Sequence, residues 1–257
     1  LAGHDPPHVP DDPGLQHRQC AIVAFEYALG RLLMDWGCRP DALMGSSLGE
    51  YTAACLSGAL SLDDVLSLVW RRGELLNDVT GGGMTLVDAP PSVLRDTSSV
   101  ANRVHEAIRV ADDAVVVSGP TDALDTLEAE LDDRNVRARR LPPRVAYHSA
   151  ALDPLREEMT RAFEAIDIQE PSLPFVANRT GDWVTPERLR SPDDWFAQMR
   201  NSVHLRDGYQ TLYDDGVRLF LEVGPGHGLT KFATLNFPDH DDVLASPCLA
   251  HPRSDES

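Results

Sequence analysis

The stretch from Asp41 to Cys55, DALMGSSLGEYTAAC, constrains the fold most strongly, because glycines and serines join a short apolar run to a helical pattern. Residues 45–49 read GSSLG and match G-x-S-x-G, the pattern of a nucleophile on a sharp turn between a strand and a helix. Glycine at both ends lets the chain turn and lets a substrate approach the backbone. The pattern predicts Ser47 as the nucleophile, with the Leu48 N–H at the helix N-terminus stabilising an oxyanion. The alternative is a turn whose serine only caps the helix.

Helical patterns precede and follow this turn. Two segments have the spacing of amphipathic helices: residues 19–36, in which Ile22, Phe25, Leu29, Leu32 and Leu33 recur, and residues 62–76, which follow Ser61 as N-cap.

Beyond residue 80 the pattern changes twice. After TGGGM, short strand patterns alternate with two helical patterns as far as Leu141, which is typical of a compact α+β unit of the ferredoxin-like kind. Helix, strand, helix and strand then recur to about residue 224, and this order on both sides of the insert fits a parallel sheet with covered faces. We expect an α/β fold with a parallel-sheet, hydrolase-like large subdomain (1–83 and 142–257) and an inserted ferredoxin-like small subdomain (84–141).

A nucleophilic serine needs a base, and the chain has nine histidines. Most lie in polar, irregular segments. His148 lies just after the insert and before a helix, where a loop can reach the carboxyl edge of a sheet. His204 and His227 remain rivals, and for each of the three an exposed or satisfied core histidine is the alternative.

One arginine lies on a helical face that should be buried. Arg72 shares its stripe with the apolar residues between Leu62 and Leu76, whereas Arg71 lines up with Glu74. An inward-facing arginine needs an anion, because an unpaired buried charge is costly. That anion is either an internal carboxylate or the carboxylate of a substrate held by a bidentate clamp.

Composition excludes several classes of protein. A formal net charge of −18 argues against unspecific nucleic-acid binding, which depends on positive charge. The four cysteines lack metal-ligand spacing, so we expect free thiols and no metal. No apolar run approaches the roughly 20 residues of a membrane span, and the first residues lack the regions of a signal peptide. We therefore expect a cytoplasmic protein.

Four blocks in order resemble the malonyl-CoA:acyl carrier protein transacylases and the acyltransferase domains of polyketide synthases. They begin WGCRPDALMGSSLGE, VSGPTDALD, PFVANRTGDWVT and LFLEVGPGHGLT, and the similarity runs from about residue 19 to 230. The resemblance implies that Ser47 is the nucleophile and His148 the base. It further implies that Arg72 holds the malonyl carboxylate, that Gln19 lines the acyl pocket, and that the backbone carbonyl of Asn178 orients the histidine.

The resemblance also implies a reaction and its partners. Ser47 would take a malonyl group from coenzyme A and pass it to the phosphopantetheine thiol of an acyl carrier protein, in polyketide or fatty-acid biosynthesis. Coenzyme A thioester is then a substrate, and no bound cofactor is expected. The bulky Tyr147 before His148 favours malonyl over methylmalonyl, because a ring there fills the space of an α-methyl branch.

Two departures from the family leave alternatives open. Ser46 stands where the family has histidine, and the family's opening glutamine block, which supplies the second oxyanion N–H, is absent. We expect the N-terminal strand to be missing and the sheet edge exposed. An acyl hydrolase with the same Ser/His dyad and a non-catalytic scaffold domain are the alternatives. The retained Arg72 disfavours the hydrolase, and the intact dyad disfavours the scaffold.

A carrier protein is usually acidic, so docking on an acidic chain needs a local positive surface. Arginines cluster just ahead of His148, at Arg134, Arg137, Arg139, Arg140 and Arg144. We expect this patch to dock the carrier or the phosphates of coenzyme A. A solvated strand edge balanced by neighbouring aspartates is the alternative.

Overall fold

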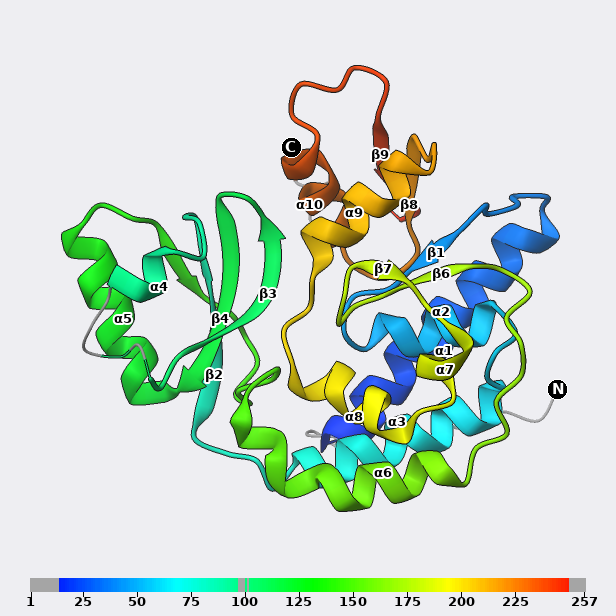
Figure 1. The fold of residues 1–257 in the computed structure, drawn as a ribbon, viewed down its shortest axis with the longest axis horizontal. Coiled ribbons are helices and arrows are strands. Elements are labelled where there is room, and N and C mark those ends of the chain that lie inside the picture. Colours follow the sequence, from blue (N-terminus) through cyan, green and yellow to red (C-terminus); the bar gives the residue numbers. More distant parts are fainter. Residues whose placement is uncertain (1–13, 97–99, 101, 250–257) are drawn as a thin grey trace, which may run out of the picture.

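The computed structural model describes residues 14–96, 100 and 102–249. A four-stranded antiparallel sheet forms one side of the molecule, to the left in Figure 1. Its order is β3-β4-β2-β5, with these bounds: β2 (Gly82–Val87), β3 (His105–Ala111), β4 (Ala114–Pro120) and β5 (Ala138–Arg140). Helices α4 (Val93–Asp96) and α5 (Thr121–Asp133) complete a β-α-β-β-α-β order along the chain. The segment after α4, expected to be helical, falls partly on residues 97–99 and 101, outside the described residues.

The parallel strands are divided between two small sheets. In one, β1 (Leu43–Met44) pairs in parallel with β6 (Phe175–Ala177), which pairs antiparallel with β7 (Asp182–Trp183). In the other, β8 (Leu219–Glu222) pairs in parallel with β9 (Leu244–Pro247). The expectation of one parallel sheet is therefore wrong for the part of the chain that the structure describes, because no described strand lies between β1 and β8 to join the two.

Helices pack around β1 and β6 to form the largest core. They are α1 (Gly14–Asp35), α2 (Gly49–Leu56), α3 (Leu62–Leu76), η1 (Ala150–Leu155), α6 (Arg156–Glu164), α7 (Pro186–Leu189) and α8 (Pro192–Arg200). The N-cap Ser61 is confirmed, because its hydroxyl accepts the Asp64 N–H at 3.1 Å. Buried rings of Tyr51, Phe163 and Trp195 tie α2, α6 and α8 together, with centroids 5.3–6.1 Å apart.

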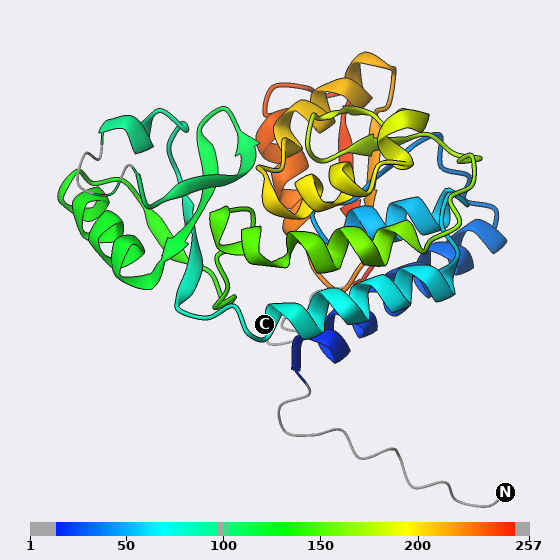
Figure 2. The same ribbon diagram turned by 60° about the horizontal axis from the view of Figure 1, so that its bottom comes forward.

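Helix α1 buries Gln19, Val23 and Gly30 rather than the apolar stripe that its spacing predicts. It lies beside α3, as the blue and cyan helices of Figure 2 show. A Cβ on Gly30 would lie 2.8 Å from Leu56 of α2, so α1 and α2 approach closely there. Of that stripe, Ile22, Phe25 and Leu32 are exposed, whereas Leu29 and Leu33 are half-buried. An amphipathic helix normally buries such a stripe.

A last group of elements covers β8 and β9. Helices α9 (Leu205–Asp214) and α10 (Gly228–Asn236) enclose a small apolar cluster with β8, β9 and β3. Helix α9 therefore connects this group to the four-stranded sheet (Figure 1). Within the described residues, no helix is both long and apolar enough to cross a membrane.

Candidate active site

Ser47 lies on the turn between β1 and α2 with its backbone in the left-handed region, at φ 52°. A non-glycine residue rarely adopts that conformation, and where it does the surroundings hold it there. Gly45 permits the turn, since a Cβ there would lie 2.0 Å from the backbone of Gly49. Gly49 meets nothing within 4 Å, so the expectation that both glycines are needed for the turn holds only for the first.

The side chain of Asn178, at the end of β6, braces this turn. Its Oδ1 accepts the N–H of Ser47 at 2.5 Å, and its Nδ2 donates to the carbonyl of Gly45. From the other side, Gln198 Nε2 donates to the carbonyl of Ser47 at 2.8 Å. Two buried amides therefore hold the backbone on both sides of Ser47.

His148 faces Ser47. Its Nε2 lies 2.9 Å from Ser47 Oγ, and its Nδ1 lies 2.9 Å from the carbonyl oxygen of Asn201. A carbonyl only accepts, so Nδ1 carries the proton and Nε2 is free to accept from the serine hydroxyl. The prediction that the Asn178 carbonyl orients the histidine is therefore wrong: the carbonyl at His148 Nδ1 is that of Asn201, and the Asn178 carbonyl accepts the His204 N–H at 2.7 Å.

The environment keeps His148 neutral. The residue is 2 % exposed, and its backbone is also left-handed, at φ 56°. Burial, and then the positive charge of Arg72, lower the pKa of His148 to about 4. At neutral pH the imidazole is unprotonated and able to take a proton from Ser47.

A buried carboxyl lies behind the turn. Glu50, in the first turn of α2, accepts the N–H of Asn178 at 3.1 Å. Burial raises the pKa of Glu50 to about 8, which outweighs the opposing hydrogen bonds and the charge of Arg179. Sequence reasoning missed Glu50, Gln198 and Asn201. The acid directly after the G-x-S-x-G pattern was the one signal that pointed to any of them.

Arg72 is buried, as its helical position predicts, and is 3 % exposed. Its Nη1 donates to Gln19 Oε1 at 2.6 Å, and its guanidinium carbon lies 5.6 Å from the centre of the Tyr147 ring. Its Nε has no partner, and no carboxylate among the described residues pairs with it. The alternative that Arg72 forms an internal salt bridge is therefore wrong for the described residues. Neighbouring Arg71 is exposed and pairs with Glu74 at 3.3 Å.

The other candidate histidines and the cysteines lie outside this constellation. His204 Nδ1 contacts Asp207 at 3.1 Å, and His227 Nε2 contacts the carbonyl of Leu249 at 2.8 Å. All four cysteines are free thiols, as expected. Among the described residues, no group of three or more His, Cys, Asp and Glu side chains is arranged to hold a metal ion.

The arginine patch is less uniform than the sequence indicates. Arg140 forms ion pairs with Asp125 and Glu128 of α5, at 2.7 and 2.8 Å, so its charge is balanced by neighbouring carboxylates. Arg139 and Arg144 are exposed. A positive surface ahead of His148 therefore depends on these two more than on Arg140.

Comparison with known proteins gives one consistent family. The sequence model of the acyl transferase domain family matches residues 10–242. The chain is 36% identical over 213 residues to the PKS-NRPS hybrid synthetase acdB of Aspergillus candidus, covering 81% of this chain and 8% of that protein. It is 35% identical over 217 residues to the spectinabilin polyketide synthase system protein NorB of Streptomyces orinoci, covering 84% and 10%. The chain thus spans about a tenth of the length of these relatives.

Solved structures agree with this. The acyl transferase domain of SpnD, in complex with 2-(pent-4-yn-1-yl)malonyl, superposes with a TM-score of 0.88 at 36% identity, over 95% of this chain and 59% of that one. FabD from Acinetobacter baumannii superposes with a TM-score of 0.79 at 28% identity, over 86% and 73%. The mixed α/β fold described above is therefore the one these proteins share.

Proposed function

The chain belongs to the acyl transferase domain family, and from that premise we propose that it moves a malonyl-type group from coenzyme A to the phosphopantetheine thiol of an acyl carrier protein, in polyketide or fatty-acid biosynthesis. One observation carries the proposal: Ser47, His148 and Asn201 form a hydrogen-bonded series beside Arg72, which is buried and has no carboxylate partner among the described residues. A nucleophile, an oriented base and an anion site lie together.

In the first half-reaction, Ser47 Oγ attacks the carbonyl carbon of the thioester while His148 Nε2 takes the hydroxyl proton. The carbonyl electron pair moves onto oxygen. When the tetrahedral intermediate collapses, the C–S bond breaks and the coenzyme A sulfur receives the proton from His148. In the second half-reaction the carrier thiol gives its proton to His148 and attacks the Ser47 ester, and Ser47 Oγ leaves and regains a proton.

The developing oxyanion would be held by the N–H of Leu48. This residue precedes α2, where helix amides point toward bound anions. The N–H of Ser47 is already taken by Asn178, whereas no acceptor among the described residues takes the Leu48 N–H. Leu48 is therefore the amide that this turn offers to the substrate.

The carboxylate of the acyl group would pair with Arg72. A buried guanidinium without a counter-ion favours a substrate that brings a negative charge. Gln19 supports this role because it fixes one Nη without neutralising the charge. The ring of Tyr147 lies against the same guanidinium and would fill the space that a methyl branch needs, which favours malonyl over methylmalonyl. The SpnD structure, whose ligand is a malonyl group substituted at carbon 2, supports a malonyl-type acyl group but not the choice between malonyl and methylmalonyl.

The decisive experiment is intact-protein mass spectrometry after mixing with malonyl-CoA, acetyl-CoA or methylmalonyl-CoA, with Ser47→Ala as control. The proposal expects a malonyl adduct that is absent in Ser47→Ala and passes to a carrier protein. Release of free coenzyme A without a lasting adduct would instead identify an acyl hydrolase. No reaction with any thioester would leave a scaffold domain.

A further inference from the structure

The extended segment between α8 and α9 carries the group that orients His148. Asn201 ends α8, where its N–H donates to the Ala197 carbonyl at 2.8 Å, and its own carbonyl reaches His148 Nδ1. The next two residues, Ser202 and Val203, turn away from α8 and run alongside β3.

Strand β3 is the outer strand of its sheet, and its free edge binds this segment. The Val203 N–H donates to the Ala107 carbonyl, and the Arg109 N–H donates to the Val203 carbonyl, both at 2.8 Å. Ser202 Oγ donates to the Glu106 carbonyl at 2.6 Å. Because the edge amides and carbonyls of β3 are used here, the segment is held as a short parallel extension of the sheet.

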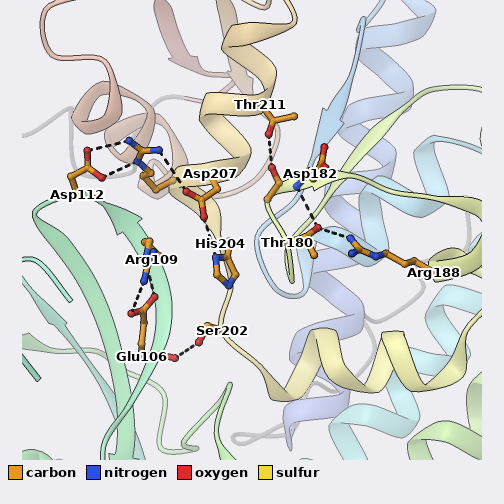
Figure 3. Close-up of polar contacts among 12 residues, drawn as sticks. Glu106, Arg109, Asp112, Thr180, Asp182, Arg188, Ser202, His204, Asp207 and Thr211 are labelled. Atoms are coloured by element: carbon orange, nitrogen blue, oxygen red, sulfur yellow. Dashed lines mark hydrogen bonds and ion pairs between the residues drawn. The ribbon is translucent and has the colours of Figure 1, made fainter. Parts of the chain in front are cut away.

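Side chains brace the same contact, as Figure 3 shows. Arg109 makes a two-pronged pair with Glu106 along β3, at 3.0 and 3.2 Å. Arg206, at the start of α9, makes a similar pair with Asp112 at the end of β3, at 2.9 and 3.2 Å. The pairing of β3 with β4 has register shifts on both sides of the segment, and such irregularities re-aim a strand.

The same sheet also holds the chain that carries His148 itself. The Leu141 N–H donates to the Met84 carbonyl of β2 at 2.9 Å, and Gly82 packs so closely on Ala146 that a Cβ would lie 2.7 Å from the Ala146 Cβ. Both partners of the His148–Asn201 hydrogen bond therefore lie on short segments that the four-stranded sheet fixes, one at β2 and the other at β3.

We propose that the edge of β3 is a positioning element of the active site and that Ser202 is its positioning residue: by fixing Ser202 and Val203 it places the Asn201 carbonyl, and so the tautomer and aim of His148. The consequence for activity rests on the proposed acyl transfer, whereas the consequence for the His148 ring does not. The sheet unit is thus part of the catalytic geometry, although none of its own side chains reaches Ser47 among the contacts described.

The test uses Ser202→Ala, with Ser202→Thr as the conservative variant that keeps the hydroxyl. Ser172→Ala is the matched control, because Ser172 Oγ also donates to a distant backbone carbonyl, that of Ser57 at 2.8 Å, at the far end of α2. Ser202 is half-buried and outside the apolar clusters, so its loss removes one hydrogen bond and no core packing.

Two readouts separate positioning from general loss of structure. The first is the ¹⁵N NMR signal of the His148 ring, assigned against His148→Ala, which reports the tautomer without any substrate. The second is the rate and KM of Ser47 acylation by malonyl-CoA. We expect Ser202→Ala to lose part of the Nδ1-protonated population and to acylate about three- to tenfold more slowly at unchanged KM. Ser202→Thr and Ser172→Ala should match the wild type in both.

A wild-type tautomer and a wild-type acylation rate in Ser202→Ala would overturn the inference while leaving acyl transfer intact. If the wild-type chain accepts no thioester, the proposed function fails, and the NMR signal still decides whether Ser202 positions His148. An equal loss of rate in Ser172→Ala would assign the effect to stability and would also overturn the inference.

Discussion

Asn178 and Ser47 are joined through the asparagine side chain, whose oxygen accepts the serine N–H while its nitrogen donates to the carbonyl two residues earlier. The nucleophile is therefore held by its backbone as well as by His148. A left-handed serine costs conformational energy, and these bonds offset that cost.

Replacing Asn178 with alanine should destabilise the fold and slow the chemistry together. The change leaves the Ser47 N–H and the Gly45 carbonyl without partners, and each unmade buried bond costs about 1–3 kcal/mol. Urea unfolding should show a loss of at least about 2 kcal/mol, and Ser47 acylation should fall.

Asn236→Ala is the matched control for that variant, because the Asn236 side chain also makes two backbone hydrogen bonds: its Nδ2 donates to carbonyls on α10 and β3. It should lose stability but acylate at the wild-type rate. Equal effects of the two variants on acylation would show that Asn178 has no special relation to Ser47.

The two glycines of the G-x-S-x-G pattern should respond oppositely to alanine. Gly45→Ala would place a Cβ against the backbone of Gly49, so soluble folded protein should be lost, or more than about 4 kcal/mol of stability. In Gly49→Ala the new Cβ has no neighbour within 4 Å, and the residue lies in a helix. The free energy of unfolding should therefore rise by less than about 1 kcal/mol. Similar effects at both positions would contradict the close approach at Gly45.

Arg72→Met should remove the acyl-group preference with little loss of stability. The guanidinium is buried without a counter-ion, so removing its charge offsets part of the cost of the unmade bond to Gln19, and urea unfolding should lose no more than about 2 kcal/mol. Loss of a two-pronged charged contact should slow malonyl-CoA acylation by about 100-fold or more, while acetyl-CoA acylation stays the same or rises. Arg71→Met, on the exposed neighbour, should change neither rate. A large loss of stability in Arg72→Met would argue for a structural role instead.

Glu50→Gln should change how stability depends on pH. The pKa of Glu50 is raised to about 8 in the fold, against the ordinary glutamate value of 4.5 in the unfolded chain. Between these values the unfolded chain has lost the proton and the folded chain keeps it, so the wild type loses stability as pH rises, by about 1.4 kcal/mol per pH unit. Glutamine does not ionise. The unfolding free energy of the variant, relative to that of the wild type, should therefore increase from pH 5 to pH 8.

His148 acts in the opposite sense, because its pKa is lowered to about 4, and stability is lost as pH falls from about 6.5 toward 4. That contribution is common to both proteins and cancels in their difference. Parallel stability curves for wild type and Glu50→Gln would contradict a buried neutral carboxyl at position 50.

The sequence predicted which side chains meet at the turn better than it predicted the hydrogen bonds that hold those side chains in place. Ser47, His148 and Arg72 carry reactive or charged groups, and their local patterns could be recognised. The partner of His148 is a backbone carbonyl, which every residue has, so nothing in the letter at position 201 distinguishes it. That assignment depends on how the segment after α8 runs along β3, which is a long-range relationship.

Helices were predicted where a local cap and a periodic face agree, as at Ser61 and α3. The periodicity of α1 was also correct, but not which face it buries, because Val23 and Gly30 face inward and Gly30 packs closely on Leu56 of α2. A parallel sheet was predicted, and the described parallel strands form two short pairs in separate sheets, a division that no local pattern shows.

The left-handed backbone at position 47 also decides which nucleophiles the turn can present. A residue branched at Cβ crowds its own backbone at positive φ, so threonine is disfavoured there even though it carries a hydroxyl. Serine and cysteine, with one heavy atom on Cβ, fit the same turn. The backbone conformation at position 47 therefore limits which nucleophilic residues can stand there, before any substrate is bound.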